Sequence, residues 1–518
     1  MLPEQFFQKL HKKIKPEWLF AFFSAFLIGF LIHLYRLVNP LLTWDSLYNF
    51  HDPQNTIHLG RCFLTITCGI SSYYDLPTVN GLLSLLYLAL TTVCLSEIFQ
   101  VKKRLSLLLL AGITVSFPTV ASTLLYMYTA DGYFLAMLLA ALAVLVTLKY
   151  RFGFLPGILL LCISYGSYQA YISYAVMLVL VWSILQLFFA RETPLRNLLG
   201  QLGRFALMGI GGTALYLLCF KFLSFLEKST ASSYQGVSSM KLPGATDLLH
   251  AVPAAVTEFV YFFFGPLSAV NLFKILNILL FALLFILFLF ALAKTALYRD
   301  LRRLGLILLA LCLLPLGCCI IYFVTPDVRY HMLMMMGFSL IYLLPVLFLD
   351  KLSEPDTSQS KITGNIATPV LSWGVVLLSA MTIYNFALIA NISYLHAHKS
   401  YEETYALALE MTDRMEQTDG FENVAKLCVI GHFEDHDAIS VNFPPDMTGI
   451  KEGYLATEQN HFAAFFETYL GLRLTGCSEE EQNALEASPA VQEMGSWPAA
   501  DSVRVEGDTV IIKIGEAP

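Results

Sequence analysis

Long runs of apolar residues follow one another over the first three quarters of the chain. A helix needs about 20 mainly apolar residues to cross the ~30 Å hydrocarbon core of a bilayer. The pattern therefore predicts a mainly α-helical, polytopic protein that crosses a membrane about eleven times. The eleven stretches lie at about 18–38, 78–99, 105–125, 131–148, 154–171, 172–190, 203–225, 267–293, 304–324, 331–349 and 369–390.

After about residue 393 the apolar runs stop and shorter patterns begin. Helical spacing of apolar residues and strict alternation indicate amphipathic helices and half-buried strands. They predict a small α/β domain over 393–518, which follows a polytopic membrane domain over 1–392. Its expected elements are helices at 400–418, 453–470 and 478–487, a strand at 426–431, and a hairpin over 502–514.

The charge of the chain divides at nearly the same place. Residues 1–395 hold 25 Lys and Arg against 16 Asp and Glu, a net charge of +9, and residues 396–518 hold 7 against 23, a net charge of −16. The whole chain is 57% hydrophobic and only 14% charged, whereas soluble chains average roughly 45–50% apolar and about 25% charged residues. This composition excludes a soluble enzyme, a fibrous protein and a disordered chain.

Basic residues cluster before the first span and in every second loop after it. Loops rich in Lys and Arg stay in the cytoplasm, so eleven spans place the N-terminus inside, the polar linker 350–367 inside, and the domain 393–518 outside. No small-residue cleavage site follows the first span, which we expect to remain as an anchor. The clusters are Lys9, Lys12, Lys13 and Lys15; Lys102, Lys103 and Arg104; Lys149 and Arg151; Arg191, Arg196 and Arg204; Lys294, Arg299, Arg302 and Arg303; and Lys351 and Lys361.

Cofactor signatures are missing from the sequence. It holds no Walker A motif, no GxGxxG and no zinc-like Cys/His spacing, so we expect no cofactor and no nucleic-acid partner. Asp45, Asp52 and Asp131 could in principle bind a divalent metal, but three scattered carboxylates are not a metal signature. Of the ten cysteines, Cys428 and Cys477 fall in the outer domain, where they either pair or remain free thiols.

Ionisable and aromatic residues gather instead in the loops predicted to lie outside. Cleaving a sugar phosphate ester requires a carboxylate that accepts the proton of the incoming hydroxyl, and cationic groups that hold the leaving phosphate. The candidates are Asp45, Asp131 and Asp52 for the base; Arg61, Arg329 and Lys221 for the phosphate; and Trp44, Tyr48, Tyr168 and Gln169 for the sugar or the acceptor.

Each candidate also has a structural explanation. A carboxylate in a loop beside a membrane is most often simply solvated. Arg329 follows Asp327 and could pair with it, and the Arg61 side chain could extend to lipid headgroups. Tyr168 could belong to the aromatic belt of the membrane interface.

Short motifs in a fixed order resemble a known family. They are Thr43-Trp44-Asp45, Gly60-Arg61, the segment 129–136 (TADGYFLA), the segment 166–173 (GSYQAYIS) and Pro326-Asp327-Val328-Arg329. Over about 15–390 the chain resembles the bacterial Gtr-type glucosyltransferases (glucosyl transferase type II) of the GT-C class, which decorate O-antigen and other glycans of the cell envelope. One departure is that Asp45 is followed by Ser46, where the family often has paired acids, so Asp52 or Asp131 would have to supply the second acid.

The resemblance implies a donor, an acceptor and a membrane. The donor would be a polyprenyl-phosphate-linked sugar, typically glucose, on the outer face of the bacterial cytoplasmic membrane, and the acceptor a surface glycan. Asp45 would be the base, with Arg61 and Arg329 on the phosphate. The alternatives are a transporter or flippase of lipid-linked saccharides, a polymerase that uses diphosphate-linked donors, and a non-catalytic scaffold. Transporters keep ionisable groups near the midplane and often have repeated halves, and neither feature occurs in this sequence.

Overall fold

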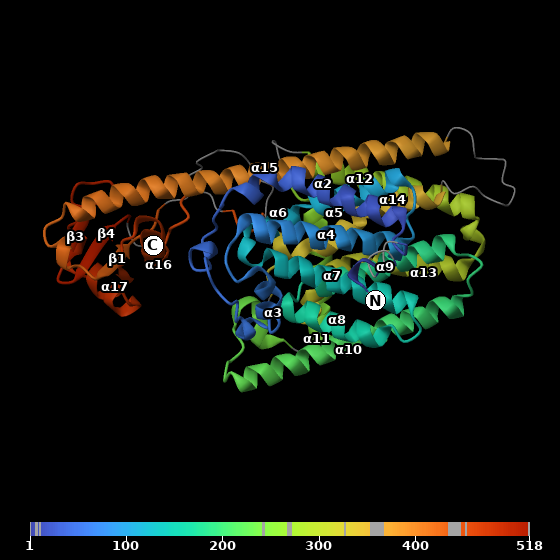
Figure 1. Cartoon of the computed structure of the whole chain (residues 1–518), viewed down its shortest axis with the longest axis horizontal. Helices are drawn as coiled ribbons and strands as arrows, with labels where there is room; N and C mark the ends of the chain where they lie inside the picture. Colours follow the sequence, from blue (N-terminus) through green and yellow to red (C-terminus); the bar gives the residue numbers. More distant parts are fainter. Residues whose placement is uncertain are drawn as a thin grey trace. The chain divides into compact units, whose positions relative to one another are not determined.

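The computed structural model describes residues 12–240, 244–266, 272–325, 328–352, 367–433, 447–450 and 453–515, and a few residues before 12 (Figure 1). Its contacts divide the chain into two compact units. The membrane unit comprises Met1–Val38, Pro53–Asn391 and Asn442–Thr448, and the C-terminal unit comprises Asn39–Asp52, Ile392–Val441 and Gly449–Pro518. That the chain folds as two domains divided at residue 392 stays a prediction.

Every apolar stretch predicted to span the membrane contains a helix, so the expectation of a polytopic helical fold is confirmed. Ten described helices are long and apolar enough to cross a bilayer, and the pair α5–α6 makes an eleventh. One of the ten is α11 (Ala245–Phe264), whereas α8 (Phe154–Ser167), at a predicted stretch, is shorter and is not among them. The helices at the predicted stretches are α2 (Pro16–Val38), α4 (Pro77–Phe99), α5 (Arg104–Ser116), α6 (Pro118–Leu125), α7 (Met127–Lys149), α8 (Phe154–Ser167), α9 (Tyr171–Phe189), α10 (Leu195–Leu226), α12 (Phe273–Thr295), α13 (Leu301–Cys318), α14 (Ser339–Leu352) and α15 (Ala367–Glu416).

The third predicted span is bent. Between α5 and α6 the axis turns by 41°, and Pro118 is the first residue of α6. Proline has no backbone N–H and disfavours helical geometry in the residue before it. Phe117 accordingly leaves the helical conformation, with φ −53° and ψ 136°.

The basic clusters meet at one end of the helix bundle, here called the basic end. Lysines and arginines there donate to the carbonyls that end neighbouring helices, groups that a helix leaves without partners. At least one residue of each predicted cluster takes part. The contacts are Lys15 and Lys149 with the Glu97 carboxylate (both 2.6 Å), Lys103 with Asp350 O (2.7 Å), Lys294 with Leu352 O (2.6 Å), Lys351 with Gln100 O (3.3 Å), Arg191 with Thr295 O, and Arg303 with Ala190 O (3.0 Å).

An additional helix, α11 (Ala245–Phe264), was not predicted. At its C-terminus, Lys274 in the first turn of α12 donates to Tyr261 O (2.8 Å) and Phe262 O (2.6 Å). Since α12 reaches the basic end with Lys294, its first turn lies at the opposite end. The 3-10 helix η4 (Tyr234–Ser239), which follows α10 and precedes α11 by only a few residues, lies at the opposite end as well. Both ends of α11 therefore lie at the end opposite the basic loops, and α11 does not change the number of crossings.

The C-terminal unit contains a four-stranded sheet of order β2-β1-β4-β3. The strands are β1 (Lys426–Ile430), β2 (Thr475–Gly476), β3 (Val503–Glu506) and β4 (Thr509–Lys513). β1 pairs parallel to β2 and β4, and β3–β4 is the predicted antiparallel hairpin. Cys428 and Cys477 are buried free thiols, so of the two alternatives the structure has the unpaired one.

Helices complete this unit. They are the end of α15, α16 (Gln459–Phe465), which continues as a π-helix over Phe466–Leu470, α17 (Glu479–Glu486) and α18 (Pro489–Gln492). Ser478 and Glu481 form a capping box at the start of α17, which is the helix predicted at 478–487. One prediction was wrong: the last span and the helix expected at 400–418 are a single helix, α15, of 50 residues. No proline or glycine follows Gly374 within α15, so no residue between the two predicted helices ends it.

Candidate active site

The candidate site in the membrane unit is built around the turn between α8 and α9. α8 has only 14 residues and is about 21 Å long at 1.5 Å per residue, so it cannot cross the full hydrocarbon core. Its last turn receives the first loop of the chain: the Phe63 N–H donates to the carbonyl of Gly166 (2.7 Å). A Cβ on Gly166 would lie 2.4 Å from the Phe63 ring, so this close approach requires glycine.

Arg61 lies against two stacked tyrosines. The rings of Tyr133 and Tyr168 are parallel within 14°, with centroids 4.2 Å apart. The guanidinium carbon of Arg61 lies 5.8 Å from the Tyr133 centroid and 5.7 Å from that of Tyr168, within cation–π range. Tyr128 and Tyr234 also interact electrostatically with Arg61. The structure thus brings two predicted residues, Arg61 and Tyr168, together.

The backbone that carries Arg61 is fixed by side chains from the α8–α9 turn and from α10. Gly60 has φ +74°, in the left-handed region that favours glycine. Gln169 donates through Nε2 to Leu59 O (2.8 Å), and the Tyr216 hydroxyl donates to Gly60 O (3.0 Å). The amide group of Gln169, predicted to contact sugar or acceptor, is therefore used to hold the loop.

Arg329 and His331 form the other side of the site. The backbone N–H of Arg329 donates to Gln235 Oε1 (2.9 Å), and its side chain is exposed. Burial, and after it the charges of Arg61 and Arg329, lower the pKa of His331 to about 4. Both arginines consequently lie close enough to act on one neutral imidazole. The alternative pairing of Arg329 with Asp327 lies outside the described residues.

Thr448 comes from a distant part of the chain and contacts this imidazole. Its hydroxyl accepts from the Leu333 N–H (3.2 Å) and lies 3.2 Å from Nδ1 of His331. A hydroxyl that accepts from an amide still has its own proton to donate, so we assign Nδ1 as the acceptor and Nε2 as the protonated nitrogen. His331 then has one N–H left to donate to a ligand.

Asp131 is the fifth residue of α7 and is completely buried. Neither carboxylate oxygen has a hydrogen-bond partner within normal geometry among the described residues. The nearby Ser71 hydroxyl donates to Cys68 O (3.0 Å) instead. An incompletely paired buried carboxylate is costly and is frequently functional, but its role as a base stays a prediction.

Four other predicted residues belong to the C-terminal unit and not to the membrane unit that holds Arg61. They are Trp44, Asp45, Tyr48 and Asp52, and their membership of the Arg61 site stays a prediction. Asp45 begins the 3-10 helix η1 (Asp45–Leu47) and is partly exposed. Its neighbours Leu42 and Leu47 pack in the core of the C-terminal unit.

Lys221 and the metal-binding candidates complete the comparison with the prediction. Lys221 is exposed on α10, five residues after Tyr216. No group of three or more His, Cys, Asp or Glu in the described part of the chain is placed to hold a metal ion. The Arg61 cluster offers two guanidinium groups, an imidazole N–H and tyrosine hydroxyls as donors, and donors of this kind suit an anion.

Three contributors to the site were not assigned from the sequence. Tyr133 follows Asp131 in a motif that was noticed for its carboxylate. His331 follows the Pro326–Arg329 motif by two residues and was given no role. Thr448 carried no signal, because nothing in its local sequence points to a contact with a residue 117 positions earlier.

The comparison with known proteins gives one match. A sequence model of the family described as Glucosyl transferase GtrII matches residues 34–344, which is more than half of the chain. The matched range includes Arg61, Asp131, Tyr133, Tyr168 and Arg329. No curated protein and no solved structure matches the chain.

Proposed function

Because the chain belongs to the glucosyl transferase GtrII family, we propose that it transfers glucose from a polyprenyl-phosphate donor to a cell-surface glycan. Membership of the family makes it a glycosyltransferase, and its apolar helices make it a multi-pass membrane protein. The proposed location is the bacterial cytoplasmic membrane. The N-terminus is inside, and the chemistry takes place on the outer face.

The observation that carries the proposal is the pair Arg61 and Arg329 around His331. The charges of both guanidinium groups act on this partly buried imidazole, which makes the site strongly positive. A phosphate that becomes a leaving group gains negative charge, which planar guanidinium donors stabilise through paired hydrogen bonds. The site is at the end of the bundle opposite the basic loops, which the positive-inside rule assigns to the outer face.

In the proposed reaction the acceptor hydroxyl attacks the anomeric carbon of the donor sugar. The bond between that carbon and the phosphate oxygen breaks, and polyprenyl phosphate leaves with the electron pair. Arg61 and Arg329 hold the leaving phosphate, and Nε2–H of His331 donates to it. A carboxylate takes the proton of the acceptor hydroxyl; we propose Asp45 for this role, with Asp131 and Asp52 as the alternatives.

A transporter of lipid-linked saccharides is less well supported, because the family is one of transferases. A polymerase remains within the same enzyme class and differs in its donor. Supplying membranes with monophosphate-linked or diphosphate-linked donor separates the two, since the proposed enzyme consumes only the monophosphate. We also propose that no cofactor or metal is needed, so that a chelator leaves the rate unchanged.

The decisive experiment replaces the proposed groups and measures transfer of labelled glucose from polyprenyl-phosphate-glucose in membranes. We expect Asp45→Asn to lower the rate by at least a hundredfold, in line with general-base effects of about 10²–10⁴-fold. Arg61→Lys, which keeps the charge and removes the planar fork, should lower it at least tenfold. Asp131→Asn is measured in parallel, and activity that survives Asp45→Asn but not Asp131→Asn would assign the base to Asp131.

Matched controls make these losses interpretable. Asp419→Asn changes an exposed carboxylate of the C-terminal unit, and Arg302→Lys changes an exposed arginine at the basic end. Both should transfer at the normal rate. If the Arg61→Lys and Arg302→Lys variants transfer glucose at equal rates, the phosphate-binding role of Arg61 is contradicted.

A further inference from the structure

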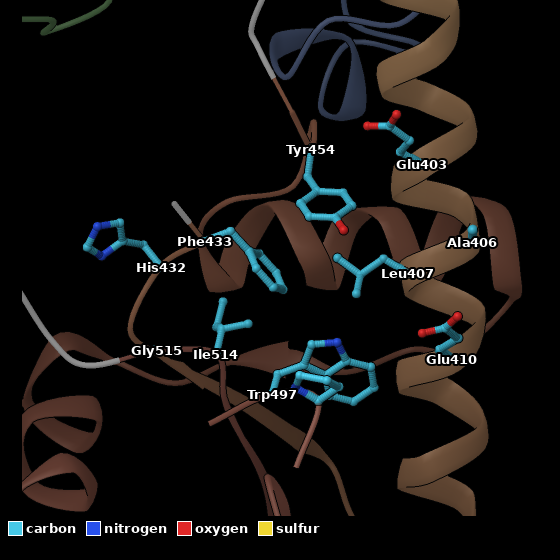
Figure 2. A pocket seen from close by; sticks show the side chains of 11 residues that line it. Glu403, Ala406, Leu407, Glu410, His432, Phe433, Tyr454, Trp497, Ile514 and Gly515 are labelled. Atoms are coloured by element: carbon cyan, nitrogen blue, oxygen red, sulfur yellow. The ribbon is translucent and has the colours of Figure 1, made fainter. Parts of the chain in front are cut away.

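A second pocket lies entirely within the C-terminal unit. It has a volume of about 810 Å³ and is lined by the end of α15, the segment after β1 and the turn before β3 (Figure 2). Pockets that bind small ligands typically measure 300–1,000 Å³ and combine aromatic walls with a few polar groups. None of the residues assigned above to donor or base lines this pocket.

Two carboxylates enter the pocket from one face of α15. Glu403 and Glu410 are seven residues apart, which is two helical turns, and Figure 2 shows both extending from α15 toward the pocket. Burial raises the pKa of Tyr454, and the charges of Glu403 and Glu410 raise it as well. Tyr454 therefore lies near both carboxylates. The adjacent Glu402 pairs with His398 and Lys399, whereas Glu403 and Glu410 have no ion-pair partner among the described residues.

Aromatic rings form the other walls. The rings of Phe433 and Tyr454 are 4.8 Å apart and tilted by 53°. Arg414, which does not line the pocket, packs against the Trp497 indole, with its guanidinium carbon 4.5 Å from the ring centroid. Its Nη1 donates to the carbonyls of Pro498 and Ala499 (both 2.8 Å). Figure 2 shows Trp497 opposite Tyr454 across the pocket. The rings are thus fixed before any ligand arrives.

We propose that this pocket, in which Glu403 and Glu410 face the rings of Tyr454, Phe433 and Trp497, binds a saccharide segment of the acceptor glycan that carries no acidic groups. Aromatic rings pack against the apolar faces of sugar rings, and a tyrosine or tryptophan can also hydrogen-bond through its polar group. Unpaired carboxylates accept hydrogen bonds from sugar hydroxyls and attract an amino group. They repel uronates and phosphates, as does the net charge of −16 over residues 396–518. The identity of the ligand as the acceptor rests on the proposed function; the saccharide selectivity does not.

Binding of three probes to the full-length protein in nanodiscs, without donor, tests this inference. The probes are tetramers of glucosamine, N-acetylglucosamine and galacturonic acid. We expect the glucosamine tetramer to bind most tightly, the neutral tetramer several-fold more weakly, and the galacturonate tetramer at least a hundredfold more weakly. The double change of Glu403→Gln and Glu410→Gln should weaken glucosamine binding at least tenfold and reduce the preference over galacturonate.

Controls separate the pocket from general effects. Glu480→Gln removes an exposed carboxylate of α17 and should leave all three affinities unchanged. Trp497→Leu should weaken binding of every sugar, and Trp497→Phe, which keeps a ring, should restore most of it. Equal binding of galacturonate and glucosamine, no binding of any tetramer at millimolar concentration, or wild-type affinities in the double glutamine variant would each overturn the inference. Binding without transfer would overturn only the proposed function.

Discussion

Replacing Gly60 by alanine tests whether the loop geometry around Arg61 is needed for activity. The added methyl group would lie 2.4 Å from Nε2 of Gln169 and 2.8 Å from the hydroxyl of Tyr216. These are the two groups that hydrogen-bond the backbone of Leu59 and Gly60. The substitution therefore displaces the contacts that fix the position of Arg61 and leaves the Arg61 side chain itself intact.

Two terms set the size of the effect. An alanine in the left-handed region costs about 1–2 kcal/mol, and the loss of one hydrogen bond of the loop adds about 1 kcal/mol. The sum, about 2–3 kcal/mol, favours displaced conformations of the loop. Because about 1.4 kcal/mol corresponds to a factor of ten, we expect kcat/KM for the lipid-linked donor to fall about 30–100-fold.

The measurement compares Gly60→Ala with Gly203→Ala in the same membranes. Gly203 lies on α10, and a Cβ there would meet no atom within 4 Å, so this variant should keep full activity or gain slightly in stability. Thermal unfolding of both purified variants shows whether the loss is local. If Gly60→Ala transfers glucose within threefold of Gly203→Ala, the argument that this loop positions Arg61 is wrong.

Two further predictions concern the other side of the site. Thr448→Val removes a hydroxyl that contacts His331 and the Leu333 N–H. We expect the KM for the donor to rise about 5–30-fold, because one or two hydrogen bonds of about 1 kcal/mol each are lost, and an unchanged KM would contradict this role. Because the pKa of His331 is lowered to about 4, the imidazole is neutral between pH 5 and 8, and His331→Gln should leave the shape of the pH–rate profile in that range unchanged. In the unfolded chain the His331 imidazole takes up a proton near pH 6.5, and in the folded protein it does not. The free energy of unfolding should therefore fall as the pH is lowered from 6.5 toward 4. It should fall less in His331→Gln, which lacks this imidazole.

The helices of the membrane unit could be predicted because length and apolar character determine whether a helix spans a bilayer. The same criterion missed α11, whose Asp247, His250 and Glu258 interrupt its apolar pattern. It also divided α15 at a change in composition. Composition indicates whether a helix lies in lipid or in water. Where a helix ends depends on residues such as proline and glycine, and α15 has neither after Gly374.

The site was predictable in part for a related reason. Arg61 and Arg329 were chosen because both lie in loops on the side without basic clusters, where cations are few. Which aromatic rings and hydroxyls surround them depends on contacts between segments far apart in the sequence. Thr448 beside His331 is such a contact, and so is Tyr216 beside Gly60.

The short helix α8 has a consequence for the lipids around the protein. Leu159 and Ile163 are exposed on its outer face, yet the helix is about 9 Å shorter than a ~30 Å hydrocarbon core. Such hydrophobic mismatch makes the adjacent bilayer thin locally. Beside α8, the headgroup of a lipid would have the shortest distance to move into the bilayer to reach Arg61. The acyl-chain length of the host bilayer should therefore influence how readily the donor enters.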